Sequence, residues 1–109
     1  MKHISVEEFK KVIEGAEQDS TVDFINVCTT PEYDEKHIPG VRSVPLDTLE
    51  QHLNEFQTKK SIYIHCRSGM RSSRAIGLLL ELGLTAELIN VEGGIIAWEH
   101  AGFETKTGE

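Results

Sequence analysis

The chain has 109 residues, 39% of them hydrophobic and 27% charged, with a net charge of −7 at neutral pH. This length supports one hydrophobic core, so we expect a single domain over residues 1–109. The acidic balance disfavours a nucleic-acid-binding surface, which needs clustered Lys and Arg. The sequence shows neither an apolar run that could cross a bilayer nor a signal-peptide pattern, so we expect no membrane partner and a cytoplasmic location by default.

The first half of the chain alternates helical and strand patterns. Ser5 and Glu8 have the spacing of a capping box before a helical stripe formed by Val6, Phe9 and Ile13. Next the sequence predicts a strand at 21–27, a short helix at 31–37 that begins with a proline, and a brief strand at 41–46.

The second half continues the alternation. Apolar residues at helical spacing predict a helix over 46–56, and the strongest strand pattern follows at 61–65. A helix is expected from about Ser72 to Gly83, then a strand at 86–91 and a last helix at 95–102, while 104–109 is expected to be a frayed tail. This alternation predicts an α/β fold in which helices cover a parallel sheet on both faces.

Two cysteines, Cys28 and Cys66, are too few for a disulfide framework, so we expect both to be thiols. Since the five histidines are widely spaced and the cysteines lack Cys-x-x-Cys spacing, we expect no metal site and no cofactor.

Cys66 comes directly after the 61–65 strand, where loops of α/β proteins bind ligands. The loop that follows carries Arg67, Gly69 and Arg71, and we expect Ser72 or Ser73 to cap the next helix. Inward-facing amides and a helix N-terminus would attract an anion and lower the pKa of the Cys66 thiol. The alternative is a buried, inert cysteine, but a small, arginine-containing loop favours a nucleophile.

Three segments resemble the motifs of the rhodanese sulfurtransferases. "CRSGMRS" (66–72) is similar to their active-site loop, "INVCTTPEYDEKHIPGVRSVPL" (25–46) to their first signature, and "NVEGGIIAWEHAGF" (90–103) to their closing motif. The resemblance covers nearly the whole chain, in the right order and spacing.

The resemblance implies a rhodanese-like five-stranded parallel sheet with helices on both faces. It also implies a double displacement, in which Cys66 takes a sulfane sulfur from a small anionic donor as a persulfide and passes it to cyanide or a thiol. The substrate-binding loop would comprise Arg67, Ser68, Gly69, Met70, Arg71 and Ser72. The related cell-cycle phosphatases have five residues between cysteine and arginine, whereas this chain has four, which favours sulfur over phosphate.

Arg67 indicates the donor, because a basic residue after the cysteine is common in rhodaneses that act on thiosulfate. The leading interpretation is therefore a thiosulfate sulfurtransferase, although Arg67 can also be a merely solvated side chain. For Arg71 two roles stay open: binding the substrate, or holding the loop through a bond to a carboxylate. The alternative function is a rhodanese-like module that relays persulfide to a sulfur-accepting protein or senses oxidants.

The chain departs from the first signature at three positions. Asn26 and Cys28 stand where the family's Asp-Val-Arg has its charged residues, and Lys36 replaces the usual glycine before His37. If the 21–27 and 61–65 strands are neighbours, Cys28 lies near Cys66, and we consider it a candidate resolving thiol. The alternative is a small apolar side chain at a strand end.

The remaining signature residues are expected to be structural. Glu32, Tyr33 and His37 belong to the first signature, and Trp98 to the core. The 92–94 turn ends a strand on the same side as Cys66, so it is placed to line the site. His65 should point away from the thiol, because adjacent strand residues face opposite sides.

Overall fold

The computed structural model describes residues 2–108. Its strands are β1 (Lys2–Ile4), β2 (Val22–Asn26), β3 (Arg42–Ser43), β4 (Ser61–His65) and β5 (Glu87–Val91). Its helices are α1 (Val6–Ala16), α2 (Thr30–Glu35), the 3₁₀ helix η1 (Leu46–His52), α3 (Leu53–Phe56), α4 (Met70–Glu81) and α5 (Gly94–His100).

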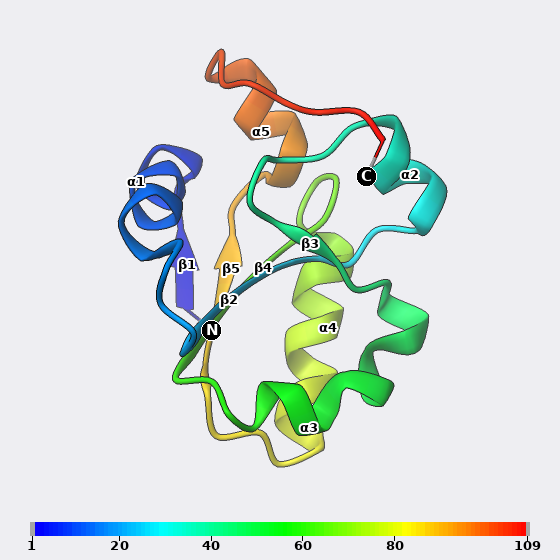
Figure 1. The fold of residues 1–109 in the computed structure, drawn as a ribbon. Coiled ribbons are helices and arrows are strands. Elements are labelled where there is room, and N and C mark those ends of the chain that lie inside the picture. Colours follow the sequence, from blue (N-terminus) through cyan, green and yellow to red (C-terminus); the bar gives the residue numbers. More distant parts are fainter. Residues whose placement is uncertain (1, 109) are drawn as a thin grey trace.

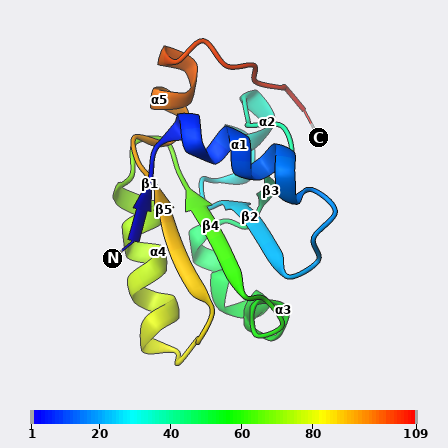
Figure 2. The same ribbon diagram turned by 90° about the vertical axis from the view of Figure 1, so that its left-hand side faces the viewer.

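The strands form one parallel sheet in the order β1-β5-β4-β2-β3. α1 and α5 cover one face, and η1, α3 and α4 cover the other, as Figures 1 and 2 show. The central strand β4 pairs with β2 through the register Asn26↔His65, so their carboxyl ends lie side by side. The predicted five-stranded sheet with helices on both faces is therefore confirmed.

Two hydrophobic clusters hold the layers together. Ile25, Ile62 and Ile64 face η1, α3 and α4, where Phe56 and Leu79 are buried against them. On the other face, the fully buried Phe9 packs against aromatic rings of the sheet and of α5. Burial of such apolar side chains contributes about 25 cal/mol per Å² removed from water.

The four strands predicted from the sequence are confirmed, although β3 is shorter than the predicted 41–46. The edge strand β1 was not predicted, because three partly exposed residues before a helix carry no strand periodicity. The helix predicted over 46–56 is split into η1 and α3 at His52, whose φ of −103° and ψ of 7° are not α-helical.

The prediction of a frayed tail is wrong for residues 104–108. Lys106 forms an antiparallel bridge with His37, and the Gly108 N–H donates to the Asp34 carbonyl. Trp98 Nε1 donates to the Glu104 carbonyl at 2.8 Å, so the tail packs across α5 and α2. Residue 109 lies outside the described residues. Among residues 2–108, no helix has the length and apolarity needed to cross a bilayer.

Candidate active site

Cys66 begins the loop that connects β4 to α4, at the carboxyl edge of the sheet. Gly69 has φ +117° and is the N-cap of α4, which starts at Met70. The predicted serine caps are therefore wrong. A left-handed glycine makes the turn, the Ser73 hydroxyl donates to the Gly69 carbonyl, and Ser72 Oγ lies 3.0 Å from the same carbonyl oxygen. Only 1% of Cys66 is exposed, so the thiol lies at the base of the loop.

The loop places hydrogen-bond donors around the Cys66 sulfur. The Gly69 N–H donates to Sγ at 3.1 Å, and Ser72 Oγ lies 3.6 Å from Sγ. Burial acts to raise the pKa of the thiol, but hydrogen bonds from the Ser72 hydroxyl and from the amides of Ser72, Gly69 and Ser68 outweigh it. The net pKa of Cys66 is below its ordinary value, which favours the nucleophilic thiolate.

Ser72 connects the thiol to the sheet. Its hydroxyl lies 2.6 Å from Asn90 Oδ1, and Asn90 Nδ2 lies 3.5 Å from His3 Nδ1. Both Ser72 and Asn90 are buried, with 0% and 5% exposed. Asn90 was not predicted as a site residue. A single polar residue inside an apolar strand does not reveal which side chain it will contact in the fold.

The start of α5 clamps the other side of the cysteine loop. The Ile95 N–H donates to the Cys66 carbonyl at 3.1 Å, and the Ile96 N–H donates to the Arg67 carbonyl at 3.2 Å. Gly94, with φ +55°, permits this approach, because a Cβ there would lie 2.3 Å from the Cys66 carbonyl oxygen. The 92–94 turn thus borders the site. The first amides of α5, which have no partner within the helix, donate to the carbonyls of the cysteine loop.

His65 lies on the opposite side of the sheet from the sulfur. Its ring is 6.5 Å from the Phe9 ring, and its Nδ1 bonds the Cys66 carbonyl at 2.9 Å. Burial lowers the pKa of His65 to about 4, so the ring is neutral at pH 7. The prediction that His65 points away from the thiol is confirmed by these contacts.

Arg71 connects α4 to α2. Its guanidinium donates to both carboxylate oxygens of Glu32 at 2.7 and 2.9 Å, and Nη2 also lies 3.6 Å from Cys28 Sγ. Glu32 in turn closes a capping box with Thr29 at the start of α2. These contacts fit the second of the two roles left open for Arg71, which is to hold the loop through a bond to a carboxylate.

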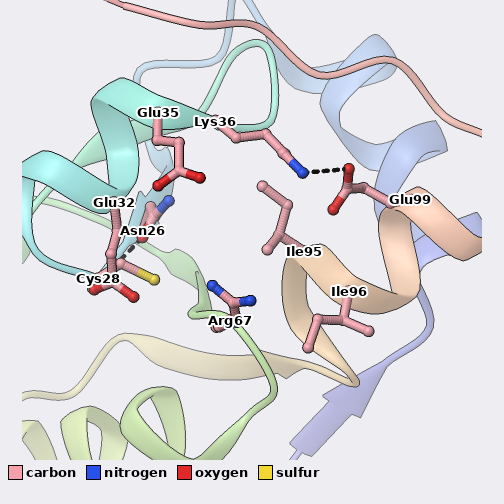
Figure 3. Close-up of a pocket in the computed structure, with 9 residues that line it drawn as sticks. All are labelled: Asn26, Cys28, Glu32, Glu35, Lys36, Arg67, Ile95, Ile96 and Glu99. Carbon is pink, nitrogen blue, oxygen red and sulfur yellow. Dashed lines mark hydrogen bonds and ion pairs between the residues drawn. The ribbon is translucent and has the colours of Figure 1, made fainter.

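The other loop side chains face solvent. Arg67 and Ser68 are exposed, and Met70 is 78% exposed. Arg67 also lines a cavity of about 90 Å³ between α2 and α5, where it lies near Cys28 and Asn26 (Figure 3). Arg67 therefore places an exposed positive charge beside the cysteine loop.

Cys28 is buried at the end of β2 and belongs to the same hydrophobic cluster as Cys66. Burial, only partly offset by Arg71, raises the pKa of its thiol to about 11. Both cysteines are free thiols. At neutral pH Cys28 is therefore protonated and a weak nucleophile, in contrast to Cys66.

The remaining predicted residues have structural contacts. His37 is buried, stacks on Tyr33 at 3.9 Å, and bonds the Tyr33 carbonyl through Nδ1. Tyr33 donates its hydroxyl to the Val41 carbonyl, and Trp98 is 4% exposed. Within the described part of the chain, no group of three His, Cys, Asp or Glu side chains converges as a metal site.

The Arg71–Glu32 pair makes stability depend on pH. Hydrogen bonds from Arg71 hold the pKa of Glu32 at about 2, below its unfolded value near 4.3, so the stability is present above that value and is lost as pH falls toward 2. Glu32→Gln keeps an α2 capping group but removes the charge. Between pH 6 and pH 2, the free energy of unfolding in urea should fall by about 1 kcal/mol less in the variant than in the parent. This figure allows for solvent screening of the partly exposed pair. Glu81→Gln, which removes an exposed carboxylate from α4, is the matched control.

Comparison with known proteins agrees with this geometry. Residues 5–101 match the model of the rhodanese-like domain family. The chain is 32% identical over 99 residues to the putative sulfurtransferase YtwF of Bacillus subtilis, covering 91% of each protein. It is 36% identical over 95 residues to the putative sulfur carrier protein YrkF of the same organism, and these cover 87% of this chain but 49% of that relative.

A solved structure gives the same result. The rhodanese-like domain protein from Staphylococcus aureus superposes with a TM-score of 0.79 and 31% identity, and the match covers 100% of both chains. The sheet order, the cysteine loop and these matches lead to one conclusion: the chain belongs to the rhodanese-like domain family.

Proposed function

We propose that this protein is a sulfurtransferase that uses thiosulfate as its donor and Cys66 as its nucleophile. The Cys66 thiolate attacks the outer sulfur of thiosulfate, the S–S bond breaks, and sulfite leaves with the electron pair. A cyanide or thiolate acceptor then attacks the terminal sulfur of the Cys66 persulfide, which regenerates the thiolate. Sulfur transfer is consistent with relatives named as putative sulfurtransferases.

The hydrogen-bond donors around Cys66 Sγ are the observation that carries this proposal. The Gly69 amide donates to Cys66 Sγ, and the Ser72 hydroxyl, 3.6 Å away, is placed to donate to it once the sulfur is a thiolate. Arg67, exposed at the mouth of the loop, supplies positive charge for a dianionic donor. The same face offers no second cysteine with a lowered pKa, since the pKa of Cys28 is raised.

Intact mass measurement tests the first half of the reaction. Incubation with thiosulfate should add one sulfur, about 32 Da, to the parent protein, and cyanide should remove it as thiocyanate. Cys66→Ala should show neither the added mass nor turnover, whereas Cys28→Ala should still gain the sulfur. An unmodified parent protein would contradict the proposal, as would the same added mass on Cys66→Ala.

A second candidate function is a persulfide relay between proteins, favoured by the similarity to a putative sulfur carrier protein. Rapid sulfur loading of Cys66 with slow thiosulfate:cyanide turnover but fast transfer to a protein thiol would support the relay. Steady turnover with cyanide would support the enzyme.

The resolving role of Cys28 remains a prediction, and the raised pKa of this thiol opposes it. If peroxide oxidises Cys66 to a sulfenic acid, attack by Cys28 would form the disulfide and release water. Mass spectrometry after mild peroxide treatment should then show a loss of about 2 Da in the parent that is absent in Cys28→Ser. Identical oxidised products in both proteins would remove this role.

A further inference from the structure

The cavity between α2 and α5 is lined by the three residues at which the chain departs from the rhodanese motif. Asn26 and Cys28, at the end of β2, and Lys36, just after α2, all line it (Figure 3). Arg67 from the cysteine loop also lines it, so the cavity opens beside the nucleophile's loop. These departures from the motif therefore alter the lining of one cavity beside the cysteine loop.

Most charges that line the cavity are already paired. Lys36 Nζ lies 2.8 Å from Glu99 Oε2, which bridges α2 and α5 across the rim, and Glu32 is held by Arg71. Glu35 and Arg67 differ, because neither forms an ion pair within residues 2–108. Figure 3 shows the Glu35 carboxylate entering the cavity from α2 and the Arg67 guanidinium entering it from the cysteine loop.

A free carboxylate and a free guanidinium in one small cavity match a ligand with the opposite pair of charges. The volume of about 90 Å³ matches a small ligand of a few heavy atoms. Ile95 and the Cys28 side chain supply apolar contacts for a short aliphatic chain. A small thiol that carries both an ammonium and a carboxylate, such as free cysteine, has this set of groups.

We propose that this cavity binds the sulfur acceptor, and that the acceptor is a small zwitterionic thiol. Arg67 binds its carboxylate and Glu35 its ammonium. This inference rests on the proposed function for its chemistry: the acceptor thiolate attacks the terminal sulfur of the Cys66 persulfide, that S–S bond breaks, and the products are the acceptor persulfide and the Cys66 thiolate. No net oxidation or reduction occurs, and Arg67 serves donor and acceptor in turn, since the two bind in separate half-reactions.

Acceptor analogues test the carboxylate and the ammonium of the acceptor one at a time. With thiosulfate as donor and sulfite release as the readout, L-cysteine should have a lower KM than cysteamine, which lacks the carboxylate, or 3-mercaptopropionate, which lacks the ammonium. Glu35→Gln should raise the KM for cysteine and cysteamine about tenfold, because one charge-assisted hydrogen bond is lost. The KM for 3-mercaptopropionate and for cyanide should not rise. Glu81→Gln, an exposed carboxylate on α4, should leave every KM unchanged.

A KM for cysteine that Glu35→Gln does not change, or one that rises equally for all four acceptors, would overturn the proposal. A binding measurement keeps this result separate from the proposed function. S-methyl-L-cysteine, which has no free thiol, should shift the amide resonances of residues 35 and 67 in the parent, and the same shifts should need about tenfold more ligand in Glu35→Gln. These shifts without any sulfur on Cys66 would refute the sulfurtransferase and leave the site standing. Sulfur on Cys66 without these shifts would refute the site alone.

Discussion

Gly94→Ala is expected to destabilise the protein by about 2–4 kcal/mol and to slow sulfur loading of Cys66 strongly. The new Cβ would lie 2.3 Å from the Cys66 carbonyl oxygen and 2.6 Å from that of Arg67, both backbone atoms that cannot rotate away. Alanine would also have to adopt φ +55°. Relief of the clash must separate α5 from the loop and break the bonds from the Ile95 and Ile96 amides.

Urea unfolding and the rate of mass gain with thiosulfate measure the two effects of this change. Gly77→Ala is the matched control, because Gly77 lies inside α4 and a Cβ there meets no atom within 4 Å. That variant should be more stable than the parent by about 0.5–1 kcal/mol and equally reactive. A Gly94→Ala protein with parental stability and loading rate would show that the close approach of α5 does not position the loop.

The sequence was most informative where local pattern and chemistry coincide. The strand pattern of 61–65, followed by a cysteine and a small basic loop, correctly located the carboxyl edge where Cys66 lies. The helix start was misplaced because Ser72 and Ser73 are good N-cap residues in isolation. In the structure a positive φ at Gly69 begins the helix earlier, and Ser72 is buried against Asn90.

Long-range pairings are what the sequence could not supply. Arg71 and Glu32 are 39 positions apart, so only the fold shows that this arginine pairs with a carboxylate of α2. The tail is similar: a polar, glycine-containing end predicts fraying, yet Lys106 pairs with His37. The grouping of Asn26, Cys28 and Lys36 around one cavity also depends on the packing of α2 over the end of β2.

Ser72→Ala is expected to slow sulfur loading of Cys66 about tenfold at pH 7, because it removes a hydrogen-bond donor from the thiolate. The Ser72 hydroxyl is among the groups that lower the pKa of Cys66 against its burial, so the pKa of the variant's thiol should be higher. The thiolate is the reactive form. The loss of rate should therefore be large near neutral pH and should disappear as pH rises above the variant's pKa. Loading rates measured by mass between pH 6 and pH 10 give the profile.

Ser73→Ala provides the matched control on the next residue of α4. Its hydroxyl donates to the Gly69 carbonyl, at 2.9 Å, but it is not among the groups that contact Cys66 Sγ. A general loosening of the loop would slow both variants at every pH, whereas loss of thiolate stabilisation shifts only the Ser72→Ala profile to higher pH. Asn90 Oδ1 and the Gly69 carbonyl oxygen, 2.6 and 3.0 Å from Ser72 Oγ, compete with the sulfur for the one proton of this hydroxyl. Asn90→Ala removes one competitor and should therefore move the profile toward lower pH. A shift to higher pH in Ser72→Ala and to lower pH in Asn90→Ala would establish that the direction of the buried Ser72 hydroxyl proton sets the reactivity of Cys66.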